Sequence, residues 1–371
     1  MNLYLTGGHL TPALAVVDEL QKKHSKVKLF FVGREFSSTI TRQPSHERSE
    51  ITKRNIPFIP IDAAKYHRGN LQQSLVEITK ILPSLWKMYT VFKQKRPNVV
   101  LSFGGYLAIP VCLVAKFFGA RVVLHEQTAV AGLANQLVAW IADIVAVSSP
   151  DSLPFFPEGK TVVTGNPIRS SLFREYKVAP EWLSEISTEK PIIYITGGSQ
   201  GSHIMNRTVS ELLPRLTRDY VIVHQCGVSA DHQNLLELQQ EREKLSEEYQ
   251  LRYIIREWVE ERDVSYLFRR AKFVISRAGA NTVQELTLAG TPAIFIPLQH
   301  AHNDEQFHNI EGLIKHDAGL LILQKDLVPD VLWETVTQME RQYDTIKENM
   351  QQEKQHLITN GTARLIELLL A

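Results

Sequence analysis

The feature that most constrains the fold is a regular alternation of short apolar runs with helical patterns. In the first half of the chain the apolar runs have the length of strands, and amphipathic or buried helical patterns lie between most of them. This alternation is typical of a parallel, doubly wound α/β sheet with helices on both faces. The expected strands of this half are residues 3–5, 27–32, 58–61, 99–101, 122–124 and 144–147.

The same alternation restarts after a polar segment that contains Pro180 and is followed by Pro191. We therefore expect a first domain at residues 1–173, a linker at 174–190, a second domain at 191–355 and a C-terminal helix at 356–371. Residues 365–370 of that helix are apolar and are expected to dock on a core. The expected strands of the second domain are residues 192–195, 220–223, 253–255, 273–275, 293–296 and 320–323.

The composition excludes some classes of protein. The chain has 371 residues and a net charge of +1, so it offers no global case for binding nucleic acid. Its two cysteines, Cys112 and Cys226, lie in apolar runs and are expected to be buried thiols. The N-terminus leads directly into a glycine turn, so no secretory peptide is expected. The apolar stretch 107–124 contains proline, glycine and charged residues, which favours a packed helix and strand over a membrane span.

Glycine-rich turns follow several of the expected strands. Gly7-Gly8 and Gly104-Gly105 each end a strand and open a helix, and the segment 197–202, GGSQGS, does the same in the second half. We expect Gly7-Gly8 and Gly104-Gly105 to lie at adjacent strand ends, where their free N–H groups could together cradle a diphosphate. None of these turns has the GxGxxG spacing, which counts against a dinucleotide enzyme.

The stretch 276–309 predicts a strand end, a tight turn, a helix, a strand and a polar loop. Glu285 lies about one turn into the helix, where a carboxylate can bind two sugar hydroxyls. The alternative is a capping box that starts at Thr282, in which Glu285 bonds only a backbone N–H. The polar loop can read a second polyhydroxylated group, so diphosphate, ribose and sugar together indicate a nucleotide sugar. His300 and His302 match no common zinc spacing, and we expect no metal.

Six segments resemble glycosyltransferase family 28, the MurG-type transferases that add N-acetylglucosamine to lipid I. They occur in the order of the family and together span nearly the whole chain. They are TGGHLTPALA at 6–15, SFGGYLAIP at 102–110, HEQTAVAGLAN at 125–135, GNPIRSSL at 165–172, GGSQGS at 197–202 and the stretch 276–309.

The resemblance implies a GT-B fold, two Rossmann-like doubly wound domains that face each other across a cleft. The first would bind the acceptor lipid I and the second would bind UDP-N-acetylglucosamine. Transfer would invert the anomeric carbon, form a β-(1→4) bond and require no cofactor. The implied catalytic residues are His9, Glu126 and Thr128. The implied acceptor residues are Gly8, Gly104, Gly105 and Tyr106. The implied donor residues are Gly7, Gly8, Thr128, Asn135, Arg169, Ser199, Val259, Ala280, Asn281, Glu285, Glu305 and Gln306.

Two departures from the family lie on the acceptor side. The loop before His9 is only TGGH, and Thr128 stands where the family generally has Asn. Two alternatives therefore stay open: a related transferase with another lipid acceptor such as diacylglycerol, or a UDP-sugar-binding paralogue without catalysis. His9 can also be a polar helix-start residue, and Arg169 can form a linker salt bridge.

The segment 75–92 combines surplus apolar residues with interleaved lysines, Trp86 and Lys87 among them. A basic helix of this kind can lie on an anionic membrane. The alternative is a buried helix with a solvated lysine face. The resemblance implies a peripheral location at the cytoplasmic face of the cell membrane.

Overall fold

The computed structural model describes residues 1–36, 45–61, 81–174, 176, 178–184, 190–198, 200–229, 232–299 and 304–371. The chain divides into two compact units, which are described separately below. Unit 1 consists of Met1–Arg169 and Ile358–Ala371, and unit 2 consists of Ser170–Leu357. The chain therefore passes between the units after Arg169 and again after Leu357.

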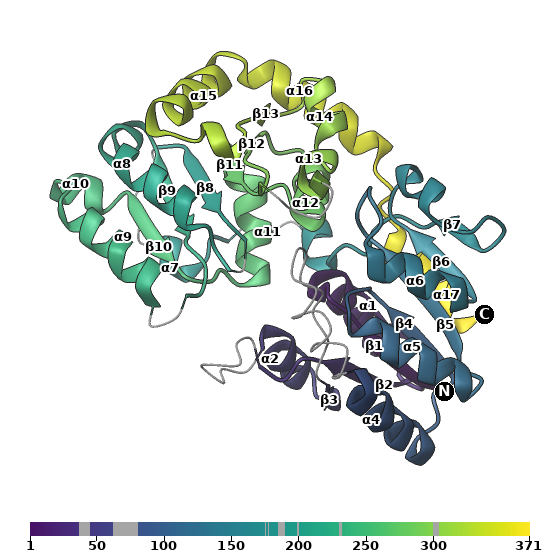
Figure 1. Ribbon diagram of the computed structural model, residues 1–371. Helices are drawn as coiled ribbons and strands as arrows, with labels where there is room; N and C mark the ends of the chain where they lie inside the picture. Colours follow the sequence, from purple (N-terminus) through teal and green to yellow (C-terminus); the bar gives the residue numbers. More distant parts are fainter. Residues whose placement is uncertain are drawn as a thin grey trace. The chain divides into compact units, whose positions relative to one another are not determined.

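The described part of unit 1 contains a seven-stranded parallel sheet in the order β3-β2-β1-β4-β5-β6-β7 (Figure 1). Its elements are β1 (Asn2–Thr6), α1 (Leu10–Lys23), β2 (Lys28–Gly33), α2 (His46–Lys53), β3 (Phe58–Pro60), α4 (Ile81–Gln94), β4 (Val99–Ser102), α5 (Ala108–Phe117), β5 (Arg121–Glu126), α6 (Leu133–Ile141), β6 (Ile144–Val147), η1 (Pro150–Phe155), β7 (Thr161–Val163) and α17 (Gly361–Leu370).

Consecutive strand residues of unit 1 are buried because helices cover both faces of the sheet. On one face, Tyr4 and Val100 pack with Met88 of α4, Val111 of α5 and Val138 of α6. On the other face, alternate strand residues pack with α1, α2 and α17: Leu3, Leu5, Phe31 and Leu101 meet Val17, Ile51, Leu365 and Leu369. The expected docking of the C-terminal helix on a core is confirmed.

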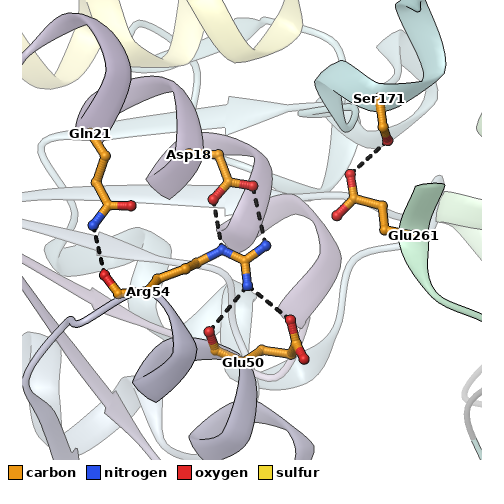
Figure 2. Close-up of polar contacts among 6 residues, drawn as sticks. All are labelled: Asp18, Gln21, Glu50, Arg54, Ser171 and Glu261. Atoms are coloured by element: carbon orange, nitrogen blue, oxygen red, sulfur yellow. Dashed lines mark hydrogen bonds and ion pairs between the residues drawn. The ribbon is translucent and has the colours of Figure 1, made fainter.

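Arg54 ties α2 to α1 on the second face. Its guanidinium donates to Asp18 Oδ1 of α1 at 2.6 Å and to Glu50 Oε2 of α2 at 2.8 Å, and its carbonyl accepts from Gln21 (Figure 2). Two carboxylates on one guanidinium fix the helix pair more firmly than a single exposed ion pair would.

The described part of unit 2 contains a six-stranded parallel sheet in the order β10-β9-β8-β11-β12-β13. Its elements are η2 (Ser170–Phe173), α7 (Glu181–Ser184), β8 (Ile192–Thr196), α8 (His203–Asp219), β9 (Val221–Gln225), α9 (Gln233–Glu243), α10 (Glu247–Gln250), β10 (Tyr253–Arg256), α11 (Glu261–Arg270), β11 (Phe273–Ser276), α12 (Ala280–Ala289), β12 (Ala293–Phe295), α13 (Glu305–His308), α14 (Glu311–Lys315), β13 (Leu320–Leu321), η5 (Gln324–Asp326), α15 (Pro329–Arg341) and α16 (Tyr343–His356).

Unit 2 repeats the layered arrangement. Ile193 and Ile195 of β8 face α8, α15 and α16. Tyr194 between them lies on the opposite face, with its ring centroid 5.8 Å from that of Phe268 of α11. The order of strands in each sheet places a switch point between the first strand and the fourth strand of the unit, β1/β4 and β8/β11. Ligands of doubly wound sheets bind at the carboxyl ends of the strands at such a point.

The expected α/β class with two parallel-sheet units is confirmed, and each expected strand corresponds to a strand of the structure. β7 was not predicted from the sequence; it is a short edge strand in which Val162 is exposed and its two neighbours are partly buried. None of the helices in the described part of the chain is long and apolar enough to cross a lipid bilayer.

Candidate functional site

In unit 1 the two glycine turns meet at the switch point. β1 and β4 are neighbours, and Gly8 N donates to Gly104 O at 3.0 Å. A Cβ at Gly7 would stand 2.7 Å from Phe103 Cβ, and a Cβ at Gly105 would stand 3.3 Å from Gly8. The glycines therefore let the two backbones approach closely at the carboxyl edge of the sheet, where added side chains would be crowded. The expected pairing of these turns is confirmed.

Asn135 of α6 packs directly on the second turn. Gly104 has φ +81°, and a Cβ there would stand 2.3 Å from Asn135 Oδ1. This Oδ1 atom is buried and has no hydrogen-bond partner within the described part of the chain. The same holds for Thr6 Oγ1 at the end of β1 and Gln127 Oε1 after β5. Buried polar atoms without partners are unusual and point to a ligand or ordered water at this edge.

His9 is the N-cap residue of α1, but its side chain makes no capping hydrogen bond. His9 therefore lies at the helix start, as the alternative expects, but its side chain does not cap the helix. Burial lowers the pKa of His9 below its ordinary value, and the negative charge of Glu126 opposes this shift. His9 is thus neutral near pH 7 and able to accept a proton.

Glu126, at the end of β5, is 1% exposed, and its carboxylate accepts four hydrogen bonds. Oε1 accepts from Thr128 N at 3.1 Å and Thr128 Oγ1 at 2.8 Å. Oε2 accepts from Gly132 N at 3.1 Å and Asn135 Nδ2 at 2.8 Å. Because all four donors are neutral groups of the following loop and helix, Glu126 holds residues 127–135 in place. Thr128 thus contacts the same carboxylate as Asn135.

His125 lies beneath this cluster, with its ring 5.6 Å from that of Phe103. Burial lowers its pKa to about 4, although Gly165 O, 3.3 Å from Nε2, opposes the shift. Tyr106 is exposed just after the second glycine turn, and Arg169 is the last residue of unit 1 before the chain enters unit 2.

In unit 2 the loop after β8 is shaped by a close backbone contact. Gly201 has φ +72°, and its missing Cβ would overlap Cys226 O, while the missing Cβ of Gly227 would overlap Gly201 N. Gly198, at φ +85°, faces open space. Ser199 lies outside the described residues, so its expected phosphate contact stays a prediction.

Arg277, directly after β11, reaches across the ends of the neighbouring strands. Its Nη2 donates to Ser202 Oγ at 2.7 Å, and its Nη1 donates to Ile296 O at 3.1 Å. Burial lowers the pKa of this guanidinium to about 10. Among the described residues its hydrogen-bond partners are neutral oxygens, which leaves a positive charge at the switch point without a carboxylate. Arg277 is not among the residues that the sequence predicted for the site; its cationic side chain directly after an expected strand was the available signal.

A buried polar network fixes the strand next to this loop. His224 Nδ1 lies 2.9 Å from Tyr253 Oη, and Nε2 lies 3.1 Å from Asn206 Oδ1. Asn206 Nδ2 donates to Cys226 O at 3.0 Å. Burial lowers the pKa of His224 to about 3, so it is neutral in the folded protein. This network supports the backbone that packs against Gly201.

The sequence pattern predicts a helix over residues 282–289, and α12 begins two residues earlier, at Ala280. The helix spans Ala280–Ala289 with Gly279 as N-cap, so Thr282 lies within the first turn and cannot be an N-cap. The capping box offered as the alternative role of Glu285 is therefore excluded. Ala280 and Asn281 form the start of the helix, and Glu285 is 3% exposed in its second turn.

The polar loop after β12 contains the remaining expected donor residues. Gln306 Oε1 accepts from Leu298 N at 2.9 Å, and Glu305 begins α13. Asn309 Nδ2 donates to Ala278 O at 3.0 Å, which joins this loop to the turn before α12. His300 and His302 lie outside the described residues. Val259 is buried in the loop after β10, on the outer strand of the sheet.

The structure thus gathers the expected residues into one set per unit. In unit 1, His9, Glu126, Thr128 and Asn135 surround the paired glycine turns. In unit 2, the start of α12, Arg277 and the loop after β8 lie at the switch point, while Val259 lies two strands away.

Two family models match the chain. The glycosyltransferase family 28 N-terminal domain matches residues 6–147, and the C-terminal domain of the same family matches residues 192–367. Two of the relatives are named UDP-N-acetylglucosamine–N-acetylmuramyl-(pentapeptide) pyrophosphoryl-undecaprenol N-acetylglucosamine transferase. The protein from Geotalea daltonii is 31% identical over 88% of this chain and 84% of its own length. That from Caldanaerobacter subterraneus is 29% identical over 98% of this chain and 96% of its own.

Among solved structures, Acinetobacter baumannii MurG superposes on the chain with a TM-score of 0.71 at 27% identity. The match covers 100% of this chain and 99% of the other.

Proposed function

Because the chain belongs to glycosyltransferase family 28, we propose that it transfers N-acetylglucosamine from UDP-N-acetylglucosamine to lipid I, giving lipid II for peptidoglycan. The two family domains correspond to the two parallel-sheet units, and the relatives that span nearly the whole chain carry this activity in their names. The expected transferase and GT-B class agree with these matches.

Arg277 is the observation that carries the donor assignment. Its partly buried guanidinium has neutral partners among the described residues and lies at the carboxyl ends of β8, β11 and β12. A diphosphate bound beside it would supply the missing negative charge. The start of α12 adds free N–H groups, and Glu285 in the next turn would bind the ribose hydroxyls. Glu305 and Gln306 would contact the sugar.

The paired glycine turns of unit 1 would hold the diphosphate of the acceptor through backbone groups, with Tyr106 beside them. His9, neutral and next to these turns, would take the proton of the acceptor hydroxyl. That hydroxyl oxygen forms a bond to the anomeric carbon as the bond from this carbon to the UDP oxygen breaks. UDP leaves with the bonding electron pair, and the configuration inverts.

Glu126 acts in this proposal by position rather than as a base. Its carboxylate is saturated by four donors, so it has no free lone pair directed at a substrate proton. It holds Thr128 and Asn135 at the edge of the site and opposes the lowering of the His9 pKa. This replaces the direct catalytic role expected for Glu126 and Thr128.

We assign membrane binding to an apolar face formed by α4, α5 and α6, which lie next to one another on one side of the sheet (Figure 1). Leu82 and Trp86 are 71% and 69% exposed one turn apart on α4, and Phe117 at the end of α5 is 76% exposed. Tyr89 bridges them, 5.9 Å from Trp86 and 6.1 Å from Phe117 by ring centroids. Exposed aromatic residues beside Lys87 and Lys93 suit an anionic bilayer surface. Residues 75–80 of the expected segment lie outside the described residues.

A turnover assay separates the three candidate functions. Purified protein is incubated with radiolabelled UDP-N-acetylglucosamine and a lipid I analogue, diacylglycerol or no acceptor. Label transferred to the lipid I analogue alone supports the proposal. Transfer to diacylglycerol indicates a related transferase, and UDP binding without any transfer indicates a non-catalytic paralogue.

A further inference from the structure

The loop 257–260, which precedes α11, is held at both ends by the segment 170–184 that follows the passage out of unit 1. At its C-terminal end, Glu261 Oε1 accepts from Ser171 Oγ at 2.6 Å (Figure 2). Ser265 Oγ, one turn further along α11, lies 3.1 Å from the same Ser171 Oγ. The first turn of α11 is therefore tied to η2.

Trp182 connects the two ends of the loop. Its indole Nε1 donates to Asp263 Oδ2, in the first turn of α11, at 2.8 Å. The guanidinium of Arg256, the residue before the loop, lies 4.9 Å from the centroid of the same indole ring. Leu183 beside it is fully buried and anchors the segment to unit 2. One side chain thus spans the loop from its entry to its exit.

The loop itself has the features of a binding loop. It follows the carboxyl end of β10 in a parallel sheet, the edge at which such sheets bind ligands. Glu257 Oε2 lies 2.6 Å from His232 Nδ1, while its buried Oε1 has no hydrogen-bond partner among the described residues. Val259 points into the core, which leaves the backbone of the loop to meet a ligand.

Backbone groups can distinguish uracil from cytosine only when they are accurately placed. Uracil presents an N3–H donor beside a carbonyl acceptor, and cytosine presents the reverse pattern at the same two positions. A loop that offers one C=O and one N–H therefore favours one base, and a shift of the loop weakens this preference as well as the affinity.

We propose that Trp182 is a positioning residue for nucleobase selection, which fixes the loop 257–260 so that its backbone selects uracil. This inference rests on the proposed function: Val259 is one of the donor residues that the resemblance to family 28 implies, and the loop around it would hold the uracil of UDP. Trp182 contacts the residues that flank the loop, Arg256 and Asp263.

Calorimetry with UDP and CDP tests the inference on four proteins: wild type, Trp182→Phe, Trp182→Ala and the control Val178→Ala. Val178 is 71% exposed on the same segment. We expect Trp182→Ala to weaken UDP binding about tenfold and CDP binding much less, so that the preference for UDP falls. Trp182→Phe keeps a ring over Arg256 and loses the N–H donor. Its preference for UDP should therefore lie between those of the wild type and Trp182→Ala.

If Trp182→Ala weakens UDP and CDP binding equally, the inference is overturned, because Trp182 is then merely structural. It is overturned as well if Trp182→Ala binds both nucleotides like the control Val178→Ala. A wild-type protein that binds UDP no better than CDP would instead overturn the donor assignment beneath it. If Trp182→Ala does not fold, Asp263→Ala and Asp263→Asn replace it. The amide oxygen of Asn still accepts from the indole, so only Asp263→Ala should lose the preference for UDP.

Discussion

Glu126 accepts a hydrogen bond from Asn135 Nδ2 at 2.8 Å, and the opposite atom of the same amide, Oδ1, packs against the backbone of Gly104. One amide thus joins the end of β5 to the turn after β4. The buried carboxylate, the start of α6 and the glycine turn form a single rigid edge, on which the proposed acceptor side of the enzyme depends.

Replacing Gly104 by Ala should damage this edge. A Cβ would stand 2.3 Å from Asn135 Oδ1, and the φ of +81° is unfavourable for alanine. Gly119→Ala is the matched control, because Gly119 has φ +74° and no atom of the described residues lies within 4 Å of its missing Cβ. We expect a backbone cost of about 1–3 kcal/mol in both variants and about 1–3 kcal/mol more in Gly104→Ala from overpacking. Thermal unfolding measures both, and equal losses would refute the contact.

His9→Ala should lower turnover by about 10²–10⁴-fold, because an acid–base group typically contributes that factor. UDP affinity should change little, since the donor residues belong to unit 2. Burial places the pKa of His9 below its ordinary value, so the wild-type enzyme should hold the neutral base at pH 7 and lose kcat/KM only below about pH 6.5.

Steady-state kinetics with saturating lipid I analogue check both statements for His9. Thr128→Asn, which restores the residue general in the family, serves as the companion variant and should not reduce turnover. If turnover of His9→Ala decreases by much less than a hundredfold, His9 is not the base.

Glu285→Ala should weaken UDP binding by about 1.5–3 kcal/mol, since hydrogen bonds from ribose hydroxyls to a charged acceptor would be lost. Glu243→Ala, an exposed carboxylate on α9, is the control and should bind UDP like the wild type. Isothermal titration calorimetry on folded protein makes the comparison. Unchanged affinity in Glu285→Ala would assign this buried carboxylate to the fold alone.

Leu82→Ser combined with Trp86→Ser should release the protein from anionic vesicles while UDP binding persists. Both side chains are mostly exposed, whereas the neighbouring Leu85 packs against the core and is left unchanged. Vesicle co-sedimentation measures the release, and circular dichroism confirms folding. Retained binding by a folded double variant would place the membrane contact elsewhere.

The alternating apolar runs were sufficient to predict both sheets, because buried parallel strands contain few polar residues and are separated by helices along the chain. The pairing of Gly7-Gly8 with Gly104-Gly105 followed from the same logic. The edge strand β7 was not predicted because its residues are not fully buried. Three relationships could not be read from spacing: Arg277 against Ser202, Asn135 against Gly104, and Trp182 between Arg256 and Asp263. Each joins residues far apart in the sequence, through contacts that depend on how neighbouring strands end.

The capping box at Thr282 shows the converse case. Thr282 and Glu285 have the residue types and spacing of a capping box. The helix nevertheless starts at Ala280, because Gly279 can serve as N-cap. The N-cap lies three residues earlier, at Gly279 rather than Thr282, which places Glu285 in the second turn and removes its capping role.

The product of a single reaction shows whether the protein transfers N-acetylglucosamine to lipid I. Wild-type protein is incubated with UDP-N-acetylglucosamine and a lipid I analogue, and NMR identifies the new linkage. We predict transfer of N-acetylglucosamine in a β-(1→4) linkage, inverted from the α-configuration of the donor. An α-linked product, or no transfer to the lipid I analogue by protein that binds UDP, would contradict it.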